Sequence, residues 1–358
     1  MRTSVERLRY VYEGVAKAWG GAPDEVAIFA ECLLRADLRG HQTQGIGLLP
    51  YLDGLFDAGV MRFGQPFEVL RDAPATALVD GHSGVGQVVA TRAMALAIDK
   101  AKRGGVGLVA VRRSSDCGMV ANYAIQAQER GLIGMAMSTG PLLVAPWGGR
   151  DAMFCTNPLA LAVPAGKRDP IVIDMATSAY SMGAVVLAAR AGAKLETRGV
   201  VDRQGRYSDD PAPVILNPMH RESRMAGALL PAGPKGFGML MFVDVLAALL
   251  SGERRWVEDV GTRGGERAAF YGQTFLAISV EHFMAADEFS AAADRMIETL
   301  RAARPAEGFE NVRLHGEAAL QTQRDFLANG VEVRDEEWRR AEELARKLGL
   351  SLERAAFR

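Results

Sequence analysis

Residues 76–112 read TALVDGHSGVGQVVATRAMALAIDKAKRGGVGLVAVR, and this stretch decides the fold class. TALVD at 76–80 and GLVAVR at 107–112 are short apolar runs bounded by turn residues, which is typical of buried strands. Between them, residues 87–103 carry apolar side chains at helical spacing, and Gly104-Gly105 end that helix. A strand, a helix and a strand in succession predict an α/β layer architecture.

The alternation of strands and helices continues through the middle of the chain, whereas both ends are helical. Further strands are expected at 132–137 (LIGMAM), 171–174 (IVID) and 275–279 (FLAIS), and a helix from about residue 179. Helices are expected after a Thr3-Ser4-Val5-Glu6 capping box, over Pro23 to Leu38, up to about Ala58, and at about 286–303 and 335–348. We therefore predict a central α/β lobe over 76–284 and a helical lobe built from 1–75 and 285–358.

The composition indicates a globular protein of the cytoplasm. Hydrophobic residues make up 49% and charged residues 24%, and the formal net charge is -1, so the sequence predicts neither a nucleic-acid nor a membrane partner. Three scattered cysteines do not form a disulfide framework, which favours a reducing compartment. The charged N-terminus is not a signal peptide, and no uncharged apolar run reaches about 18 residues, the length of a membrane span.

The strongest local motif is Gly233-Pro234-Lys235-Gly236-Phe237-Gly238, followed by the apolar run MLMFVDVLAALL. Glycines let a backbone approach a ligand closely, and the first turn of a helix offers free N–H groups with a partial positive charge. Lys235 adds a full positive charge, so the motif fits a phosphate or pyrophosphate site in which Lys235 and Gly236 take part. It also fits a glycine-rich turn with a solvated lysine, and a buried helix is expected to follow in either case.

Two further motifs follow predicted strands directly. IVID-MATS at 171–178 ends its strand at Asp174 and continues with small and hydroxylated residues, including Thr177. Ligands of open α/β sheets favour the carboxyl ends of strands, but the same residues also suit an ordinary helix cap. In VRRSSDCGMVANYA at 111–124, Asp116 lies just past a strand at the start of an expected helix. This carboxylate fits either a helix cap or a functional acid.

Several well-known catalytic motifs are absent from the sequence. There is no G-x-G-x-x-G after a first strand, no P-loop and no H-E-x-x-H. The five histidines (His41, His82, His220, His282 and His315) lack metal-ligand spacing, so no metal site is expected. No serine or cysteine stands in a nucleophile elbow. A zinc hydrolase or a P-loop NTPase is therefore not indicated.

Five motifs in the same order resemble one family over nearly the whole chain. They are RADLRGHQTQGIGLLPY (35–51), PWGG (146–149), TNPLALAVP (156–164), IVIDMATS (171–178) and PKGFGMLMFVDVL (234–246). The segment HGEAAL (315–320) resembles a further family segment, usually P-G-E. The chain thus resembles the malate/L-lactate dehydrogenase family, which includes sulfolactate dehydrogenase, ureidoglycolate dehydrogenase, diketogulonate reductase and Δ1-piperideine-2-carboxylate reductase.

The resemblance implies an α/β fold that is not a Rossmann fold, a homodimer with active sites near the subunit interface, and NADH or NADPH as cofactor. The 76–284 lobe would then bind the dinucleotide. Carried over by motif, the residues that contact it are Thr139, Asp174, Met175, Ala176, Lys235, His315, Gly316 and Glu317.

The chain departs from the family pattern S-H-G-V-x-R-L-P-x-Y. It has Thr43 in the serine position, Gln44 for the histidine, Leu48 for the arginine and Leu52 for the tyrosine. Residues 44, 48 and 52 would share one face if the segment were helical, and Thr43, Leu48 and Leu52 are expected beside the substrate. The second family histidine corresponds to Asp116. The resemblance therefore predicts that the usual proton donor and carboxylate anchor are both replaced.

These replacements favour an atypical substrate. Without the arginine, a carboxylate loses its bidentate partner. Gln44 cannot release a proton at neutral pH, and Asp116 can do so only if burial raises its pKa. A protonated imine needs no acid during hydride transfer, so reduction of a C=N bond, for example in a cyclic imine or a biosynthetic intermediate, is favoured over C=O. Two alternatives stay open: a 2-hydroxy-acid dehydrogenase that uses Asp116 or His41 as acid and base, and a catalytically silent protein that binds dinucleotide.

Overall fold

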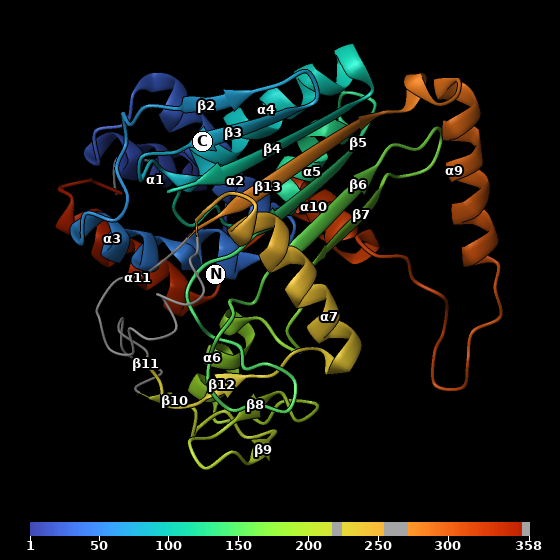
Figure 1. Ribbon diagram of the computed structural model, residues 1–358. Helices are drawn as coiled ribbons and strands as arrows, with labels where there is room; N and C mark the ends of the chain where they lie inside the picture. The colour runs from blue at the N-terminus through green and yellow to red at the C-terminus, as the bar shows by residue number, and fades with distance from the viewer. Residues whose placement is uncertain (217–223, 254–270, 353–358) are drawn as a thin grey trace.

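A mixed seven-stranded sheet forms the centre of the protein. The computed structural model describes residues 1–216, 224–253 and 271–352; His220 lies outside them. From one edge to the other, the strands are β2 (Glu68–Asp72), β3 (Thr76–Asp80), β4 (Val106–Arg112), β13 (Gln273–Ser279), β5 (Leu132–Ser138), β6 (Leu159–Val163) and β7 (Ile171–Met175) (Figure 1). Only β3 and β4 are parallel neighbours in this sheet. The strand β13, which comes late in the sequence, lies between β4 and β5, so segments far apart in the sequence are neighbours in the sheet.

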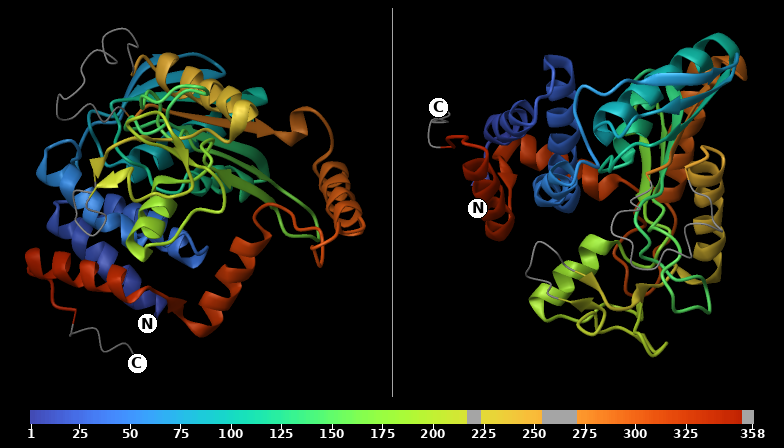
Figure 2. Two further views of the ribbon diagram at one scale, coloured as in Figure 1. Left: turned by 90° about the horizontal axis from the view of Figure 1, so that it is seen from below. Right: turned by 60° about the vertical axis from the view of Figure 1, so that its left-hand side comes forward.

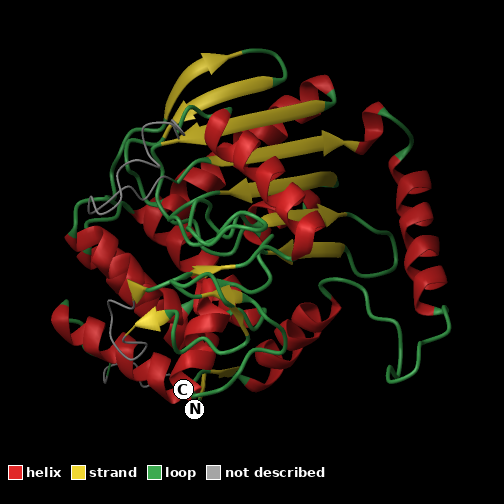
Figure 3. Cartoon of the chain, turned by 60° about the horizontal axis from the view of Figure 1, so that its bottom comes forward, coloured by secondary structure: helices red, strands yellow, loops and turns green. Residues whose placement is uncertain are grey.

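Helices cover both faces of the sheet. The helices α4 (Gly86–Gly104) and α5 (Ala121–Gln128) pack on one face, and α7 (Gly233–Asp244), with its π-helical continuation η3 (Val245–Leu249), packs on the other (Figure 3). Successive side chains of a strand point to opposite faces, so Ala136 of β5 contacts the α4–α5 side while Met137 contacts the α7 side. A Cβ on Gly107 would lie 2.0 Å from the carbonyl oxygen of Ala97, so this close helix–sheet contact requires glycine.

The two ends of the chain build one helical lobe beside the sheet, and the α/β fold is confirmed, although the helix predicted at about 286–303 in this lobe is not part of it. Its helices are α1 (Val5–Ala18), α2 (Pro23–Leu38), α3 (Leu49–Asp57), α10 (Glu317–Asn329) and α11 (Asp335–Lys347), and two 3-10 turns, η1 (Gln42–Gln44) and η2 (Ile46–Leu48), lead into α3. The short strands β1 (Arg2–Thr3) and β14 (Val331–Glu332) pair antiparallel and tie the two ends together (Figure 2). The capping side chain of α1 is Ser4, which accepts from the N–H of Arg7 at 3.2 Å, so the cap lies one residue later than expected from Thr3.

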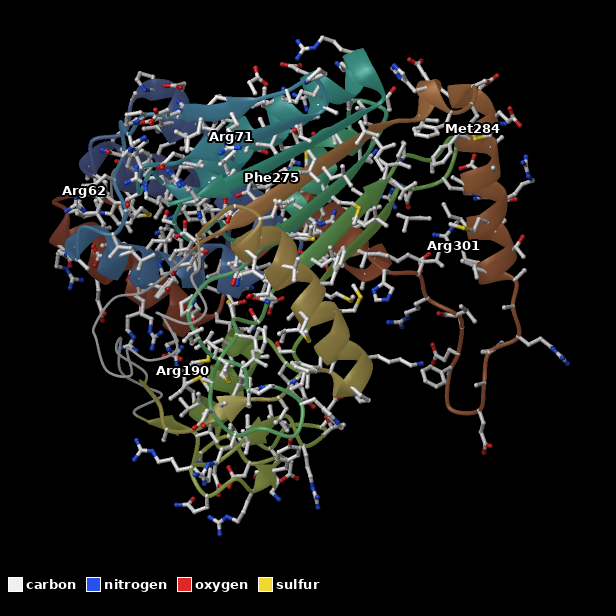
Figure 4. The ribbon with its side chains drawn as sticks, viewed as in Figure 1. Arg62, Arg71, Arg190, Phe275, Met284 and Arg301 are labelled. Atoms are coloured by element: carbon white, nitrogen blue, oxygen red, sulfur yellow. The ribbon has the colours of Figure 1, made fainter. Side chains whose placement is uncertain are left out.

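The helix α9 (Ala286–Arg301) stands apart from this lobe, beside the β6–β7 edge of the sheet (Figures 1 and 2). The Asp294 carboxylate accepts three backbone N–H groups of the 166–168 turn that joins β6 to β7. The short turn η4 (Val280–His282) links β13 to α9. Arg301, at the lower end of α9 in Figure 4, pairs with Glu317 at 2.6 Å and thereby fixes the start of α10.

A third, smaller unit lies below the sheet in Figure 1. It contains α6 (Met182–Ala191), a three-stranded sheet of β12 (Ala228–Leu229), β8 (Val200–Val201) and β9 (Tyr207–Ser208), and the pair β10 (Ile215–Leu216) and β11 (Arg224–Met225). Its core holds Val144, Val200 and Leu229. Arg190 of α6 reaches the helical lobe, where it lies 3.4 Å from the Glu337 carboxylate, so this ion pair connects the two units (Figure 4). None of the described helices is long and apolar enough to cross a membrane.

Candidate active site

The turn between α2 and α3 carries Gln44 and Leu48 to the loop that follows β4. A Cβ built on Gly118 would lie 3.5 Å from the Gln44 carbonyl oxygen and 3.6 Å from Leu48 Cδ2. Gly118 has a φ of +68°, and its N–H donates to Asp116 Oδ1 at 2.8 Å. The structure therefore brings together three of the residues predicted from the sequence: Gln44, Leu48 and Asp116.

Buried Asp37 at the end of α2 holds this turn from below. Its carboxylate accepts from the N–H of Ile46 at 3.1 Å and from the Tyr12 hydroxyl. A Cβ on Gly45 would lie 2.2 Å from Asp37 Oδ1, so position 45 has room only for glycine. Burial raises the pKa of Asp37 to about 7, the negative charge of Glu337 adds to the shift, and the two hydrogen bonds oppose it.

The loop that carries Asp116 is fixed by hydrogen bonds to neighbouring elements. Ser115 Oγ accepts from the N–H of Gly86 at 2.7 Å and donates to the Gly84 carbonyl at 2.9 Å, while Gln273 Nε2 donates to the Ser115 carbonyl at 3.1 Å. Burial raises the pKa of the Asp116 carboxyl, and the hydrogen bond from Gly118 opposes that shift. The direction of this shift favours Asp116 as a proton donor over an ordinary surface carboxylate.

Two tyrosines that the sequence analysis missed lie beside Asp116. The hydroxyl groups of Tyr51 on α3 and Tyr271 before β13 hydrogen-bond to each other. Burial raises the pKa of both phenols, and the charge of Asp116 raises them further. A Cβ on Gly140 would lie 3.2 Å from Tyr271 Cε1 and 3.3 Å from Cys155 Sγ, so the tyrosine pair borders the loop after Thr139.

His41 precedes the 3-10 turn η1 and lies near Arg39. Burial lowers the pKa of the His41 imidazole, and the positive charge of Arg39 lowers it further. His41 is therefore mostly neutral at pH 7, and a neutral imidazole is a much weaker acid than imidazolium. This electrostatic setting counts against His41 as a relocated proton donor.

A second group of predicted residues contacts α7 and the segment before it. Thr139 Oγ1 donates to Asp244 Oδ1 at 3.4 Å, and Asn157 Nδ2 donates to the same oxygen at 3.2 Å. Thr177 Oγ1 donates to the Asn157 carbonyl at 3.1 Å, and the Thr177 carbonyl accepts from the N–H of Ala232 at 3.1 Å. Thr177 is thereby joined to the residue before the start of α7, whereas Thr139 contacts Asp244 at the end of the same helix.

The helix start at Lys235 presents bare backbone and an exposed lysine. A Cβ on Gly236 would lie 3.1 Å from the Thr177 carbonyl oxygen, whereas Cβ atoms built on Gly233 and Gly238 would meet nothing within 4 Å. Lys235 is exposed. Open space over glycines at a helix N-terminus, with a cation beside it, suits a phosphate group. The helix that follows is amphipathic rather than buried: Met241 and Phe242 are exposed, while Leu240 and Val243 are buried.

Asp174 lies at the end of β7, beside the start of α5 and near Arg39 of the helical lobe. Burial raises the pKa of Asp174 to about 6, and the charge of Arg39 and a hydrogen bond with the backbone of Ala121 at the start of α5 oppose the shift. Met175 is 40% exposed, so its side chain lies at the surface. Ala176, which follows it, is partly buried.

The His315-Gly316-Glu317 turn packs against β7, next to Asp174. Gly316 has a φ of +86°, and a Cβ there would lie 2.4 Å from the Val172 carbonyl oxygen. His315 is exposed. Glu317 binds Arg301 and also accepts from the N–H of Leu314 at 3.1 Å, so its carboxylate holds the local structure together.

The expected single helical face through residues 44, 48 and 52 does not form. Gly45, with φ -109° and ψ -118°, separates the two 3-10 turns, and α3 begins only at Leu49. Leu52, which was expected beside the substrate, is fully buried in the core of the helical lobe. Thr43 packs against the start of α6, where a Cβ on Gly183 would lie 3.0 Å from the Thr43 side chain.

The site has features that fit a dinucleotide and a small substrate. The fully buried Gln87 side chain has neither of its polar atoms hydrogen-bonded among the described residues, and its Nε2 lies 3.5 Å from a Cβ built on Gly118. Such an amide offers a donor and an acceptor to a bound molecule. In the described ranges, no group of three or more His, Cys, Asp or Glu side chains is arranged to hold a metal ion.

Comparisons with known proteins place the chain among dehydrogenases. The family profile described as malate/L-lactate dehydrogenase matches residues 3–342. The malate dehydrogenase of Pyrococcus horikoshii is 35% identical over 342 residues, which are 92% of this chain and 91% of that protein. The ureidoglycolate dehydrogenase (NAD(+)) of Escherichia coli O157:H7 is 30% identical over 94% of this chain and 93% of its own length. The structure of delta1-piperideine-2-carboxylate reductase from Pseudomonas syringae pvar. tomato matches with a TM-score of 0.81 and 28% identity, covering 96% of this chain and 100% of that one.

Proposed function

The chain belongs to the malate/L-lactate dehydrogenase family and is an NAD(P)-dependent oxidoreductase, and from that premise we propose that it reduces a C=N or C=O bond of a small molecule, with C=N preferred. The relatives act, by their names, on hydroxy acids and on a cyclic imine acid, so both bond types occur within the family. The proposed substrate is an atypical one, a cyclic imine or a biosynthetic intermediate.

The observation that carries the C=N preference is the set of residues that the structure brings to the Asp116 loop. Where the resemblance calls for an arginine, Leu48 lies against the Gly118 loop, and an apolar side chain cannot bind a carboxylate. Where it calls for a histidine, the turn presents the amide residue Gln44. An iminium carbon becomes a neutral amine when it receives a hydride, so this step requires no acid. An ionised Asp116 next to the iminium would stabilise its positive charge.

The dinucleotide is proposed to lie along a strip that runs from the end of β7, at Asp174 to Thr177, to Lys235 at the start of α7. Lys235 and the open first turn of α7 suit the phosphates, and the Thr139 and Thr177 segments border the same strip. When bound, the reduced nicotinamide supplies the hydride. The residues of this chain orient the substrate, exclude water around Asp116 and set the charge that faces the reacting carbon.

Two alternative functions fit the chain besides the one proposed. A 2-hydroxy-acid dehydrogenase that uses Asp116 as acid and base is supported by the raised pKa of that carboxyl, whereas the lowered pKa of His41 does not support His41 in the role. A catalytically silent protein that binds dinucleotide would keep Lys235 and the 171–178 segment intact. Turnover of any substrate would end this last reading.

We propose the homodimer on a separate observation. The outer face of α7 and η3 carries four large apolar side chains that are 44–48% exposed: Met241, Phe242, Val245 and Leu249. A continuous apolar strip of this kind is typical of a subunit interface. Light scattering after gel filtration should give the mass of a dimer, and Val245→Arg should shift it to a monomer. A monomeric wild-type protein would contradict the proposal.

The test of the function compares two substrates of the same carbon skeleton, a cyclic imine and the matching 2-oxo acid, with NADPH and NADH. We expect a higher kcat/KM for the imine. Asp116→Asn should lower imine reduction, since it removes the charge that stabilises the iminium, while cofactor binding stays unchanged. A higher kcat/KM for the oxo acid would reverse the preference and favour the hydroxy-acid dehydrogenase.

A further inference from the structure

The Tyr51–Tyr271 pair is the feature of the site that neither the sequence motifs nor the proposed imine reduction accounts for. The two residues are 220 positions apart and come from the helical lobe and from the start of β13. Tyr271 is 2% exposed and Tyr51 is 40% exposed. The pair therefore runs from the buried start of β13 to the surface, and its hydroxyl–hydroxyl hydrogen bond lies between the two rings.

The surroundings of the pair connect it to both halves of the site. Asp116 is close enough for its charge to act on both phenols, and Tyr271 contacts the positions of Gly140 and Cys155, next to Thr139. Tyr51 follows Gln44 and Leu48 along the same turn and helix, and it is exposed whereas Leu52 is buried. A phenol hydroxyl is thus present where the replaced histidines leave a carbonyl substrate without an acid.

We propose that Tyr51 is the proton donor for reduction of C=O bonds at this site, and that Tyr271 is the positioning residue that holds its hydroxyl. The inference rests on the proposed function and extends it to carbonyl substrates. Tyr51 thus takes the place of His41 and Gln44 as the candidate acid. The charge of Asp116 keeps Tyr51 protonated until the substrate oxygen develops its own charge.

In the proposed step, the carbonyl carbon receives a hydride from the reduced nicotinamide, which is thereby oxidised, and the C=O π pair moves to the oxygen. The O–H bond of Tyr51 breaks and a new O–H bond forms on the substrate, which leaves as an alcohol. The Tyr51 oxygen keeps the electron pair as a phenolate and accepts the hydrogen bond of Tyr271. A proton from solvent then restores the phenol after the alcohol has left.

The electrostatics support a donor that stays protonated. Burial and the charge of Asp116 both raise the pKa of Tyr51, so the phenol is neutral at physiological pH. A developing alkoxide is a stronger base than a phenolate, so the proton still moves downhill to the substrate. An iminium substrate develops no such negative charge, and its reduction is independent of the pair.

The experiment uses Tyr51→Phe and Tyr271→Phe, with Tyr207→Phe in the small unit as an exposed control. Each variant is assayed with the imine and oxo-acid pair described above. We expect Tyr51→Phe to lower kcat for the oxo acid by on the order of 10²-fold or more, the usual contribution of a general acid, and to change imine reduction by less than about twofold. Tyr271→Phe should lower the same kcat less, and Tyr207→Phe should leave both rates unchanged.

A second readout needs neither cofactor nor turnover. In protein with ¹³C-labelled tyrosine rings, the Tyr51 signal, assigned through Tyr51→Phe, should titrate at lower pH in Asp116→Asn than in the wild type. Tyr271→Phe should also change that titration, because it removes the hydrogen-bond partner. Equal titration in all three proteins would overturn the arrangement even if the enzymatic assay were lost to poor folding.

The outcomes separate this inference from the proposed function. A wild-type protein that binds neither NADH nor NADPH would overturn both. A protein that binds cofactor and reduces imines but no oxo acid would overturn the inference alone. Equal losses on both substrates in Tyr51→Phe would also overturn it, since they would indicate a structural effect.

Discussion

Replacing Asp37 by asparagine should remove a large pH dependence of stability. Asp37 is fully buried beneath the turn that carries Gln44, and its pKa rises to about 7 from an ordinary value of 3.8. The unfolded chain ionises this carboxyl at its ordinary pKa, whereas the folded protein holds the proton up to about pH 7. The stability that Asp37 contributes is therefore complete below pH 3.8 and is lost as the pH rises through 7.

The size of the loss follows from the two pKa values. One pH unit between them corresponds to about 1.4 kcal/mol of unfolding free energy, so the interval from 3.8 to about 7 corresponds to roughly 4 kcal/mol. Asparagine has no ionisation and keeps an oxygen that accepts from the N–H of Ile46. It alters the hydrogen bond with Tyr12, which lowers stability by about 1 kcal/mol. Asp37→Asn should thus be less stable than the wild type near pH 4 and more stable near pH 8.

Urea unfolding at half-unit steps from pH 4 to pH 8 measures both stability curves. Asp99 on α4 is exposed, so Asp99→Asn is the matched control and should follow the wild type. Parallel curves for Asp37→Asn and the wild type would refute the reasoning, since they would mean that Asp37 ionises at the same pH in the folded and unfolded protein.

Three further predictions concern the site. Gly316→Ala should lower the free energy of unfolding, measured in urea, by about 2 kcal/mol or more and should weaken NADPH binding, because a Cβ would lie 2.4 Å from the Val172 carbonyl oxygen at a φ of +86°. The control is Gly349→Ala, which has a positive φ but no atom within 4 Å, so it measures the backbone strain without the clash. His41→Ala should change oxo-acid reduction less than about threefold, as expected for a histidine that is neutral at pH 7, and a loss of 10²-fold would restore it as the acid. Dialysis against EDTA should leave turnover unchanged, and a loss that Zn²⁺ or Mg²⁺ restores would contradict a metal-free mechanism.

The sequence was sufficient to predict the elements with strong local signals. The helix α2 has the predicted bounds, because Pro23 at its start and the apolar spacing to Leu38 mark both ends. The strands β3, β4, β5 and β7 follow the predicted apolar runs within a residue or two. The strand β2 was missed because all five of its residues are exposed, so it has no apolar pattern to detect. The helix α10 was missed for a related reason, since Phe326 is its only buried residue.

The site was predictable where a motif lies within one segment and not where distant segments meet. Asp116, Thr139, Thr177 and Lys235 each follow a strand or begin a helix, so their positions could be read locally. The Tyr51–Tyr271 contact could not, because it depends on β13 entering the middle of the sheet. Leu52 was expected in the site because the segment was treated as one helix. The break at Gly45 restarts the helix at Leu49, and Leu52 is then fully buried while Tyr51 is 40% exposed.

The most direct test of the proposed function is a fluorescence titration of the purified protein with NADH and with NADPH, run beside Lys235→Ala. The account predicts saturable binding of at least one of the two, weakened at least tenfold in Lys235→Ala because the phosphates lose a cation at the start of α7. No binding of either cofactor at millimolar concentration would contradict it. Binding that is unchanged in Lys235→Ala would move the dinucleotide to another part of the site.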